Sequence, residues 1–322
     1  MMTEFDLIKR FFAEQPVQRK DVLLGIGDDC AIVTTNEKQH IAVTTDTLVA
    51  GVHFFEDAEP RAIGHKSLAV SLSDLAAMGA EPSWISIALT LPKVDEAWVA
   101  EFCAGVFELA EYYNVQLIGG DTTSGPLSIT VTAQGLTPAD KRLTRAGARA
   151  GDWLFVTGDL GDGALALNYL LNKVEVESAY REQIIDKLLY PKPRVLAGQL
   201  IREYATAAID LSDGLIGDLQ HICEASNVGA NIVLDDLPLS AALTETLPLE
   251  RAQQLALSGG DDYELLFTVT EDNKVGIETA LNNAGIKHSC IGQLNGNGKI
   301  TTTLNNQAVK INAKAFEHFS ND

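Results

Sequence analysis

The sequence predicts a mixed α/β protein with two domains. Its 322 residues, 46% of them hydrophobic, are enough for two ordinary cores. Short β-like runs alternate with helix-like ones along most of the chain, and one polar, basic stretch interrupts this alternation. We therefore expect an N-terminal domain at 1–137, a linker with a basic segment at 138–152, and a C-terminal α/β domain at 153–322.

In the first half, strands are expected where apolar or β-branched residues follow one another, and helices where apolar residues recur with helical spacing. The expected strands are 23–26, 41–45, 84–91, 115–118 and 128–132. The expected helices are 60–79 and 95–113. Asp95 is suited to cap the start of the second helix, and Asn114 follows its end.

The alternation restarts after the basic stretch. The expected strands are 153–157, 207–210, 231–234, 263–270 and 287–293. The expected helices are 162–171, 180–190, 193–204, 214–226 and 272–284. The Asn-Gly-Asn-Gly segment at 295–298 is typical of a hairpin turn.

Charge excludes several classes of partner. The chain has 44 acidic and 24 basic side chains, a net charge of −20, which is the wrong sign for holding nucleic acid or anionic lipid. No stretch reaches the roughly 18 uninterrupted apolar residues that a membrane span needs. The four cysteines are scattered, which favours buried thiols in a reducing cytoplasm over zinc or disulfides. Because the chain is strongly acidic, an anionic ligand must bind together with cations.

Aspartates recur where expected strands give way to glycine-rich or polar turns. The segments are 25–29, 44–47, 119–123, 209–214 and 258–262, and Asp74 lies on an expected helix. In α/β sheets, such strand ends are common ligand sites. For any one of them, ordinary turn or cap chemistry is the simpler interpretation. Their number favours a shared site, in which carboxylates ~4 Å apart would repel by several kcal/mol unless cations neutralise them.

The composition of this site indicates the metal. Oxygen ligands without nearby Cys or His select Mg²⁺, Mn²⁺ or Ca²⁺, and no calcium-binding loop pattern is present. Mg²⁺ prefers a few carboxylates together with substrate phosphates.

The segment 141–149 carries four cations and no anion, and it is either a solvated linker or a phosphate clamp. Walker A and protein-kinase signatures are missing from the sequence.

Seven segments together resemble the thiamine-monophosphate kinase family. They are GIGDDCA (25–31), TTDTLVAGVHF (44–54), LSDLAAMGA (72–80), LIGGDTT (117–123), LTRAGARAGD (143–152), AIDLSDGL (208–215) and LSGGDDYEL (257–265). This family is similar to aminoimidazole ribonucleotide synthetase and selenophosphate synthetase. The resemblance implies an aminoimidazole ribonucleotide synthetase-like fold, in which the N-terminal domains of a homodimer pair into a β-barrel beside C-terminal α/β domains.

The resemblance also implies phosphoryl transfer from ATP to thiamine monophosphate, which gives thiamine diphosphate and ADP with the help of several Mg²⁺ ions. The implied magnesium ligands are Asp29, Thr44, Thr45, Asp46, Asp74, Asp121, Asp210 and Asp213, of which Asp74, Asp121 and Asp210 are catalytic. The implied ATP-site residues are Gly120, Asp121, Arg145 and Ser212. His53, Asp261 and Phe316 are implied on the thiamine monophosphate side. Asp261 stands where the family commonly has Glu, and Phe316 where it commonly has Tyr or Trp.

In the expected mechanism, the attacking phosphate oxygen is already anionic and needs no strong base. The barrier is repulsion between two anions, so metals and Arg145 would neutralise and align them for direct in-line transfer. A covalent intermediate stays an alternative. Two other functions also stay open: a different acceptor, as in aminoimidazole ribonucleotide synthetase, and a non-catalytic acidic metal-binding protein.

Overall fold

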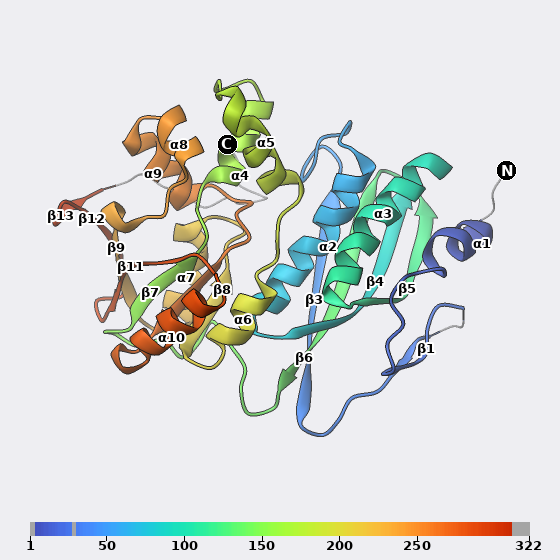
Figure 1. Cartoon of the computed structure of the whole chain (residues 1–322), viewed down its shortest axis with the longest axis horizontal. Helices are drawn as coiled ribbons and strands as arrows, with labels where there is room; N and C mark the ends of the chain where they lie inside the picture. Colours follow the sequence, from blue (N-terminus) through green and yellow to red (C-terminus); the bar gives the residue numbers. More distant parts are fainter. Residues whose placement is uncertain (1–3, 28–29, 311–322) are drawn as a thin grey trace. The chain divides into compact units, whose positions relative to one another are not determined.

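A computed structural model describes residues 4–27 and 30–310 (Figure 1). The chain divides into two compact units, which confirms the predicted α/β architecture with two domains. The first unit comprises Met1–Leu75 and Ala80–Asp140, and the second comprises Ala76–Gly79 and Lys141–Asp322. Within the expected linker, the second unit begins at Lys141, and Leu143 and Ala148 are buried.

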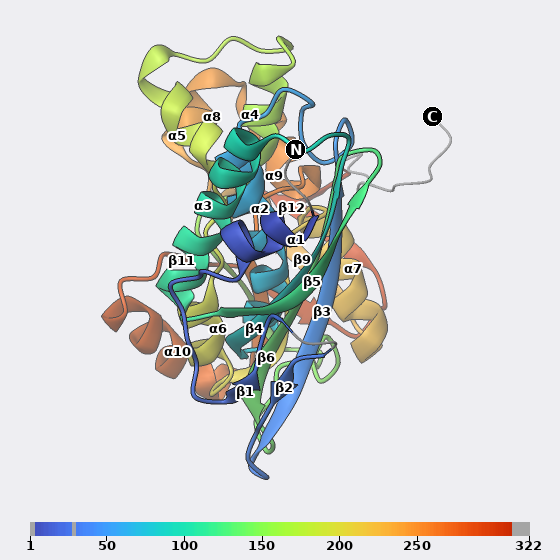
Figure 2. The ribbon, with the colours of Figure 1, turned by 90° about the vertical axis from the view of Figure 1, so that its right-hand side faces the viewer.

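The first unit is a four-stranded sheet covered on one face by two helices. Its strands follow the order β3 (Gln39–Val49), β6 (Ser128–Pro138), β4 (Glu81–Leu91) and β5 (Gln116–Ser124). Only the β4–β5 pair is parallel. Figures 1 and 2 show α2 (Pro60–Ala77) and α3 (Glu96–Tyr113) on the same side of these strands. The smaller elements are α1 (Glu4–Leu7), the π-helical turn η1 (Ile8–Phe12), β1 (Val22–Leu24) and β2 (Ile32–Val33).

The two helices approach closely because glycines stand where their backbones cross. A Cβ atom at Gly64 would lie 2.1 Å from the Phe102 carbonyl oxygen, and one at Gly105 would lie 2.0 Å from that of Arg61.

The predicted caps of α3 are confirmed: the Asp95 carboxylate accepts hydrogen bonds from backbone N–H groups of the first turn, and Asn114 has a left-handed backbone at the end of the helix. Within the described ranges, no helix is long and apolar enough to cross a membrane.

The other face of this sheet carries exposed side chains on β3. Along this strand, Ala42, Thr44 and Asp46 are partly buried, whereas Ile41 and Val43 are 46% and 62% exposed. Alternate residues of a strand point to opposite faces, so Ile41 and Val43 lie on the face away from α2. We call this the open face.

The second unit is built on a seven-stranded mixed sheet in the order β13-β12-β9-β11-β7-β10-β8. In chain order the strands are β7 (Trp153–Thr157), β8 (Ala205–Asp210), β9 (Gly229–Val233), β10 (Leu265–Val269), β11 (His288–Asn295), β12 (Ile300–Leu304) and β13 (Gln307–Val309). The helices are α4 (Asp162–Leu170), α5 (Ser178–Leu189), α6 (Val195–Ile201), α7 (Leu215–Ser226), η2 (Leu234–Asp236), α8 (Ala241–Thr246), α9 (Leu249–Ser258) and α10 (Glu271–Asn283).

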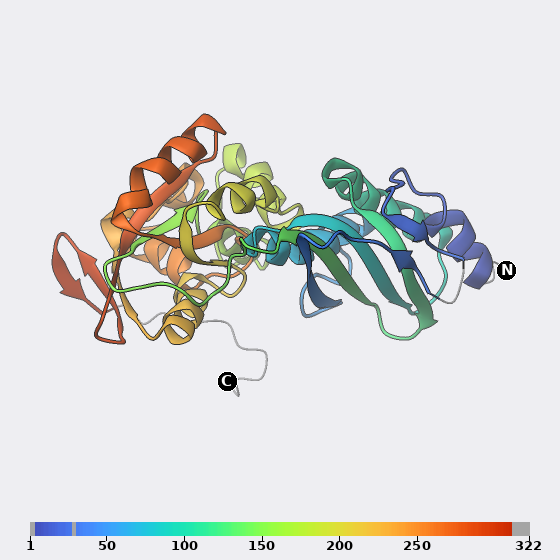
Figure 3. The ribbon, with the colours of Figure 1, turned by 90° about the horizontal axis from the view of Figure 1, so that it is seen from below.

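Both faces of this sheet are covered, and Figures 2 and 3 show α7 and α10 on opposite sides of it. Leu154 and Val156 of β7 belong to the same buried cluster as the apolar side of α7. Phe155 points to the other face and stacks on Phe267, with ring centroids 5.4 Å apart. Helices α4, α5, α8 and α9 enclose a separate apolar cluster.

The prediction of a hairpin turn at 295–298 is wrong. Strands β11 and β12, which this segment connects, do not pair with each other but flank β9 on either side. The actual hairpin joins β12 to β13, where Asn305 and Asn306 both have left-handed backbones. Turn residues alone do not reveal that a third strand lies between the two that they connect.

A buried ion cluster fixes the segment before β10. Glu264 is fully buried, accepts a hydrogen bond from the Arg194 Nε atom at 2.6 Å, and lies 3.3 Å from the Lys187 Nζ atom. The Thr157 hydroxyl donates to the same carboxylate at 2.7 Å. Burial alone would raise the pKa of Glu264, but the hydrogen bonds and charges of Arg194 and Lys187 hold it below its ordinary value.

We expect Glu264→Gln to lower the free energy of unfolding by about 3 kcal/mol at pH 7, because it leaves two cations without their anion. Since the folded pKa is lowered, this stabilisation is present above the unfolded value near 4.5 and is lost as the pH falls through the folded value. The variant should therefore lose less stability than the wild type between pH 7 and pH 3.

Denaturant unfolding monitored by circular dichroism at these pH values measures both effects. The matched control is Glu203→Gln, which removes the ion pairs of an exposed carboxylate with Lys141 and Arg202 and should change stability by less than about 1 kcal/mol. Equal losses in the two variants would contradict a stabilising role for the buried cluster.

Candidate active site

On the helix-covered face of the first unit, Thr44 and Asp46 of β3 point toward α2. The Thr44 hydroxyl donates to the Asp74 carboxylate, and the Ser71 hydroxyl donates to that of Asp46 at 2.7 Å. Burial raises the pKa of Asp46, while the Ser71 hydrogen bond and the charge of His53 work in the opposite direction. The structure therefore brings Thr44, Asp46 and Asp74 to one face.

Thr45 and His53 occupy different surroundings. The Thr45 side chain lies on the open face, where its hydroxyl is 3.0 Å from that of Thr132. His53 follows β3 in a turn, and its Nδ1 atom accepts the Val49 N–H group at 3.0 Å. A neutral His53 therefore carries its proton on Nε2, and its charged form lies close enough to Asp46 to affect the pKa of that carboxyl.

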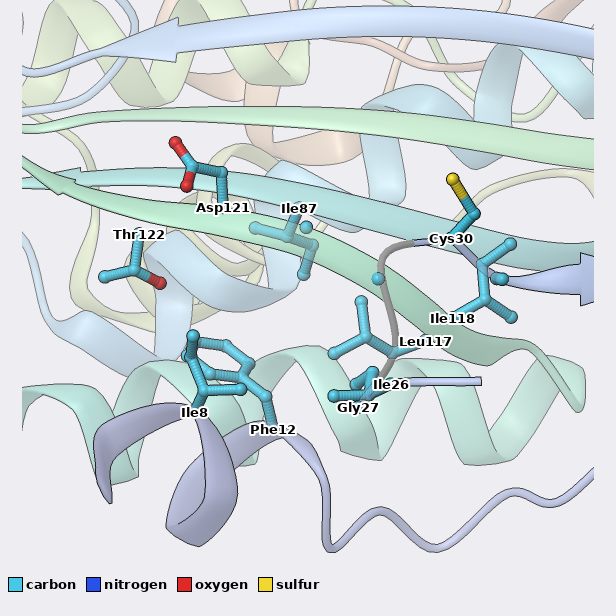
Figure 4. A pocket seen from close by; sticks show the side chains of 13 residues that line it. Ile8, Phe12, Ile26, Gly27, Cys30, Ile87, Leu117, Ile118, Asp121 and Thr122 are labelled. Atoms are coloured by element: carbon cyan, nitrogen blue, oxygen red, sulfur yellow. The ribbon is translucent and has the colours of Figure 1, made fainter. Parts of the chain in front are cut away.

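Strand β5 carries Gly119, Gly120 and Asp121 beside a cavity of about 470 Å³ (Figure 4). Apolar side chains from η1, β4, β5 and the segment after β1 line most of it: Ile8, Phe12, Ile26, Ile87, Leu117 and Ile118. Asp121 and Thr122 project to opposite sides of β5, and Asp121 is exposed. The arrangement offers an apolar pocket with a carboxylate at its rim.

The two glycines beside Asp121 have different physical requirements. Gly120 has φ +155°, and a Cβ atom there would lie 2.0 Å from the Ile87 carbonyl oxygen, so the contact with β4 requires glycine. At Gly119, a Cβ atom would have no described atom within 4 Å. Gly119 lines the cavity, so this open space belongs to the pocket.

Sheet order separates the two acidic motifs of the first unit. Asp46 aligns with Val131 on β6, Val131 with Ile87 on β4, and Ile87 with Gly120 on β5. Asp121 itself aligns with Ala88, Thr130 and Thr47, so the two aspartates lie in adjacent transverse rows on opposite edge strands, with their side chains on opposite faces of the sheet. Three strand spacings, about 14 Å, separate them within one copy.

This placement corrects an expectation. Asp46 and Asp121 lie within their strands, not at strand ends as predicted, whereas Asp210 is the last residue of β8. Edge strands with one open face tolerate such polar residues. Among the described residues, no group of three or more His, Cys, Asp or Glu side chains gathers closely enough to hold a metal ion. Asp29 and Phe316 lie outside the described residues.

In the second unit, the turn between β8 and α7 holds Asp210, Ser212 and Asp213. The buried Asp218, in the first turn of α7, accepts the backbone N–H groups of Ser212 at 3.1 Å and Asp213 at 3.2 Å. Burial raises the pKa of Asp218 to about 7, the charge of Asp213 adds to this, and that of Arg145 opposes it. Arg145 therefore lies near this turn. Sequence reasoning missed Asp218, although an acid in a first helical turn often binds the preceding backbone.

The Asp261 loop is attached to the same turn. Asp261 and Tyr263 have left-handed backbones, with φ +66° and +50°. The Asp261 N–H group donates to the Ser212 carbonyl oxygen at 3.0 Å, and the Tyr263 hydroxyl donates to the Asp261 carboxylate at 3.0 Å. The structure thus brings together the predicted residues Arg145, Ser212, Asp213 and Asp261.

These donor sets fit Mg²⁺, which takes oxygen ligands. Carboxylates occur singly or beside a hydroxyl, and Mg²⁺ usually combines one or two carboxylates with waters and substrate phosphates. Carboxylate oxygens alone would repel a phosphate, so these residues suit an anionic substrate only together with cations.

Comparison with known proteins identifies the family. Residues 27–137 match the N-terminal domain and residues 149–305 the C-terminal domain of the AIR synthase related proteins. The chain is 49% identical over 319 residues to the thiamine-monophosphate kinase of Escherichia coli (strain K12), covering 98% of each chain. It is 37% identical to that of Bacillus subtilis (strain 168), covering 84% of this chain and 85% of the relative.

Solved structures agree with this assignment. A crystal structure of thiamine-monophosphate kinase from Stenotrophomonas maltophilia K279a matches with a TM-score of 0.87 and 42% identity, covering 96% of this chain and 98% of the other. AaThiL complexed with AMPPCP and TMP matches with a TM-score of 0.77 and 32% identity, covering 99% and 97%. The chain therefore belongs to the thiamine-monophosphate kinase family, within the AIR synthase related proteins.

Proposed function

We propose that the protein transfers the γ-phosphoryl group of ATP to thiamine monophosphate, giving thiamine diphosphate and ADP. The observation that carries this proposal is the 49% identity with the Escherichia coli kinase across 98% of both chains. It is supported by the structural neighbour that holds AMPPCP, an ATP analogue, together with TMP. The acidic motifs of the two units suit a reaction between two phosphate anions.

The residues proposed to hold Mg²⁺ are Asp46 and Asp74 with Thr44, then Asp121, and in the second unit Asp210 and Asp213. Asp29 and Thr45 complete the proposed set, with Thr45 using its backbone because its side chain bonds Thr132 on the open face. When bound, Mg²⁺ supplies positive charge that neutralises phosphate oxygens. Asp74, Asp121 and Asp210 are the proposed catalytic members.

The nucleotide is proposed to bind at the cavity beside β5. Its apolar lining suits a flat base, and Gly119 and Gly120 present backbone rather than side chains next to it. Arg145 and Ser212 are the proposed phosphate-binding residues of the second unit. A guanidinium pairs well with phosphate oxygens, and it opposes the charge that builds up during transfer.

His53, Asp261 and Phe316 are proposed to bind thiamine monophosphate. The attacking oxygen is already an anion, so none of these residues needs to act as a strong base. Their work is to orient the acceptor for direct in-line transfer without a phosphoenzyme. A carboxylate at Asp261 suits the amino group or the positive charge of the thiamine rings.

We further propose a homodimer in which two four-stranded sheets join edge to edge into a β-barrel. β3 and β5 are the two edges of the sheet, and Asp46 and Asp121 occupy adjacent transverse rows across it. Placing β5 of one copy against β3 of the other would bring the segment with Gly120 and Asp121 beside the strand that carries Thr44 and Asp46. Closure would also bury the exposed Ile41 and Val43 on the open face.

Phosphorus NMR tests the reaction directly. A mixture of the protein, MgATP and thiamine monophosphate should develop the signals of ADP and of a new diphosphate, and EDTA should stop their growth. The matched control replaces thiamine monophosphate by the acceptor of aminoimidazole ribonucleotide synthetase, which should give no turnover. The proposal would be contradicted by ATP consumption with the other acceptor but none with thiamine monophosphate. ATP consumption that is equally fast without any acceptor would contradict it as well.

Two neighbouring substitutions test the nucleotide site. Gly119→Ala should raise the ATP KM about tenfold, because its methyl group enters the cavity, while leaving the melting temperature within about 2 °C of wild type. Gly120→Ala should instead lower the melting temperature, because its Cβ atom collides with the Ile87 carbonyl. An unchanged ATP KM for a folded Gly119→Ala would place the nucleotide elsewhere.

A further inference from the structure

The loop before β10 has an unusual backbone that its surroundings hold in place. Asp261 and Tyr263, both in the left-handed region, flank Asp262. Left-handed non-glycine residues cost roughly 1 kcal/mol or more each, and they persist where neighbouring contacts determine the conformation. Both oxygens of the Asp262 carboxylate accept the Gly161 N–H group, at 2.9 and 3.0 Å.

Backbone bonds fix the same loop to the β8–α7 turn. The Asp261 N–H group donates to the Ser212 carbonyl oxygen at 3.0 Å, and the Tyr263 N–H group to that of Leu211 at 2.8 Å. At Gly163, which lies against the Asp261 backbone, a Cβ atom would be 2.6 Å from the Asp261 carbonyl oxygen. The loop is therefore a rigid support for its side chains.

This backbone turns the Tyr263 side chain back toward Asp261. Tyr263 is 9% exposed, and its hydroxyl lies 3.0 Å from the Asp261 Oδ1 atom. Because the ring is packed, the hydroxyl has little freedom and restricts the rotamer of Asp261 in turn.

We propose that Tyr263 is a positioning residue for the acceptor substrate, whose hydroxyl holds the Asp261 carboxylate in its substrate-binding orientation. This inference rests on the proposed function, because it assigns a role in binding thiamine monophosphate. The sequence did not indicate it, because residue types do not show that the backbones of Asp261 and Tyr263 are both left-handed.

Tyr263→Phe removes the hydroxyl and keeps the ring. We expect the KM for thiamine monophosphate to rise about fivefold to tenfold, with the ATP KM and kcat changed less than about twofold and the melting temperature nearly unchanged. The matched control is Tyr180→Phe, which removes a tyrosine–carboxylate hydrogen bond of 2.8 Å to Glu245 on the surface of the same unit. It should leave all these constants at their wild-type values.

A double-mutant cycle shows whether the hydroxyl acts through Asp261. Asp261→Asn should itself raise the KM for thiamine monophosphate, and adding Tyr263→Phe to it should cause no further rise. An unchanged KM in Tyr263→Phe, or an equal rise in both backgrounds, would overturn the proposal. Failure of the proposed function is distinct from either result, since the wild-type protein would then not phosphorylate thiamine monophosphate at all.

Discussion

The order of strands in the first sheet constrains everything that its acidic motifs can do. β3 and β5 are the two edges of this sheet, so hydrogen-bonded strands between them keep Asp46 and Asp121 about 14 Å apart within one copy. Neither side chain can move across the sheet without breaking it. A phosphate site that uses both motifs is consistent with this constraint only if a second copy supplies one of them.

The second unit supports its part of the site in a different way. The buried Glu264, paired with Arg194 and Lys187, fixes the start of β10, and Asp262 fixes the loop before it to Gly161. The loop in turn bonds the backbone of Ser212. Ser212, proposed for the nucleotide, and Asp261, proposed for the acceptor, are therefore held by one continuous set of polar contacts, which suits a reaction that depends on alignment.

Much of the fold could be predicted from local sequence signals, since the start, end and apolar side of a helix depend on residues that are close together in the chain. Apolar spacing and the Asp95 and Asn114 caps predicted α3 to within a residue. Pairing is not local, so the hairpin at 295–298 was predicted although β9 separates its strands. The short helices α8 and α9 were missed for a related reason, because their stability comes from packing on α4 and α5.

The candidate site shows the same division. Motif resemblance predicted which residues to consider, and the structure places Thr44, Asp46 and Asp74 together and Arg145, Ser212, Asp213 and Asp261 together. Motif resemblance did not indicate Asp218 or Tyr263, because each acts on its neighbours through a backbone conformation that residue types do not specify. Nor could spacing along the chain reveal that Asp46 and Asp121 occupy opposite edges.

The central claim, that each phosphate site combines β3 of one copy with β5 of another, is tested most directly by mixing two inactive variants. Asp46→Asn and Asp121→Asn should each be inactive alone. After subunit exchange, half of the dimers contain one copy of each variant and keep one intact site of two, so about a quarter of wild-type activity should return. Activity no higher than that of the separate variants would contradict a site shared between copies.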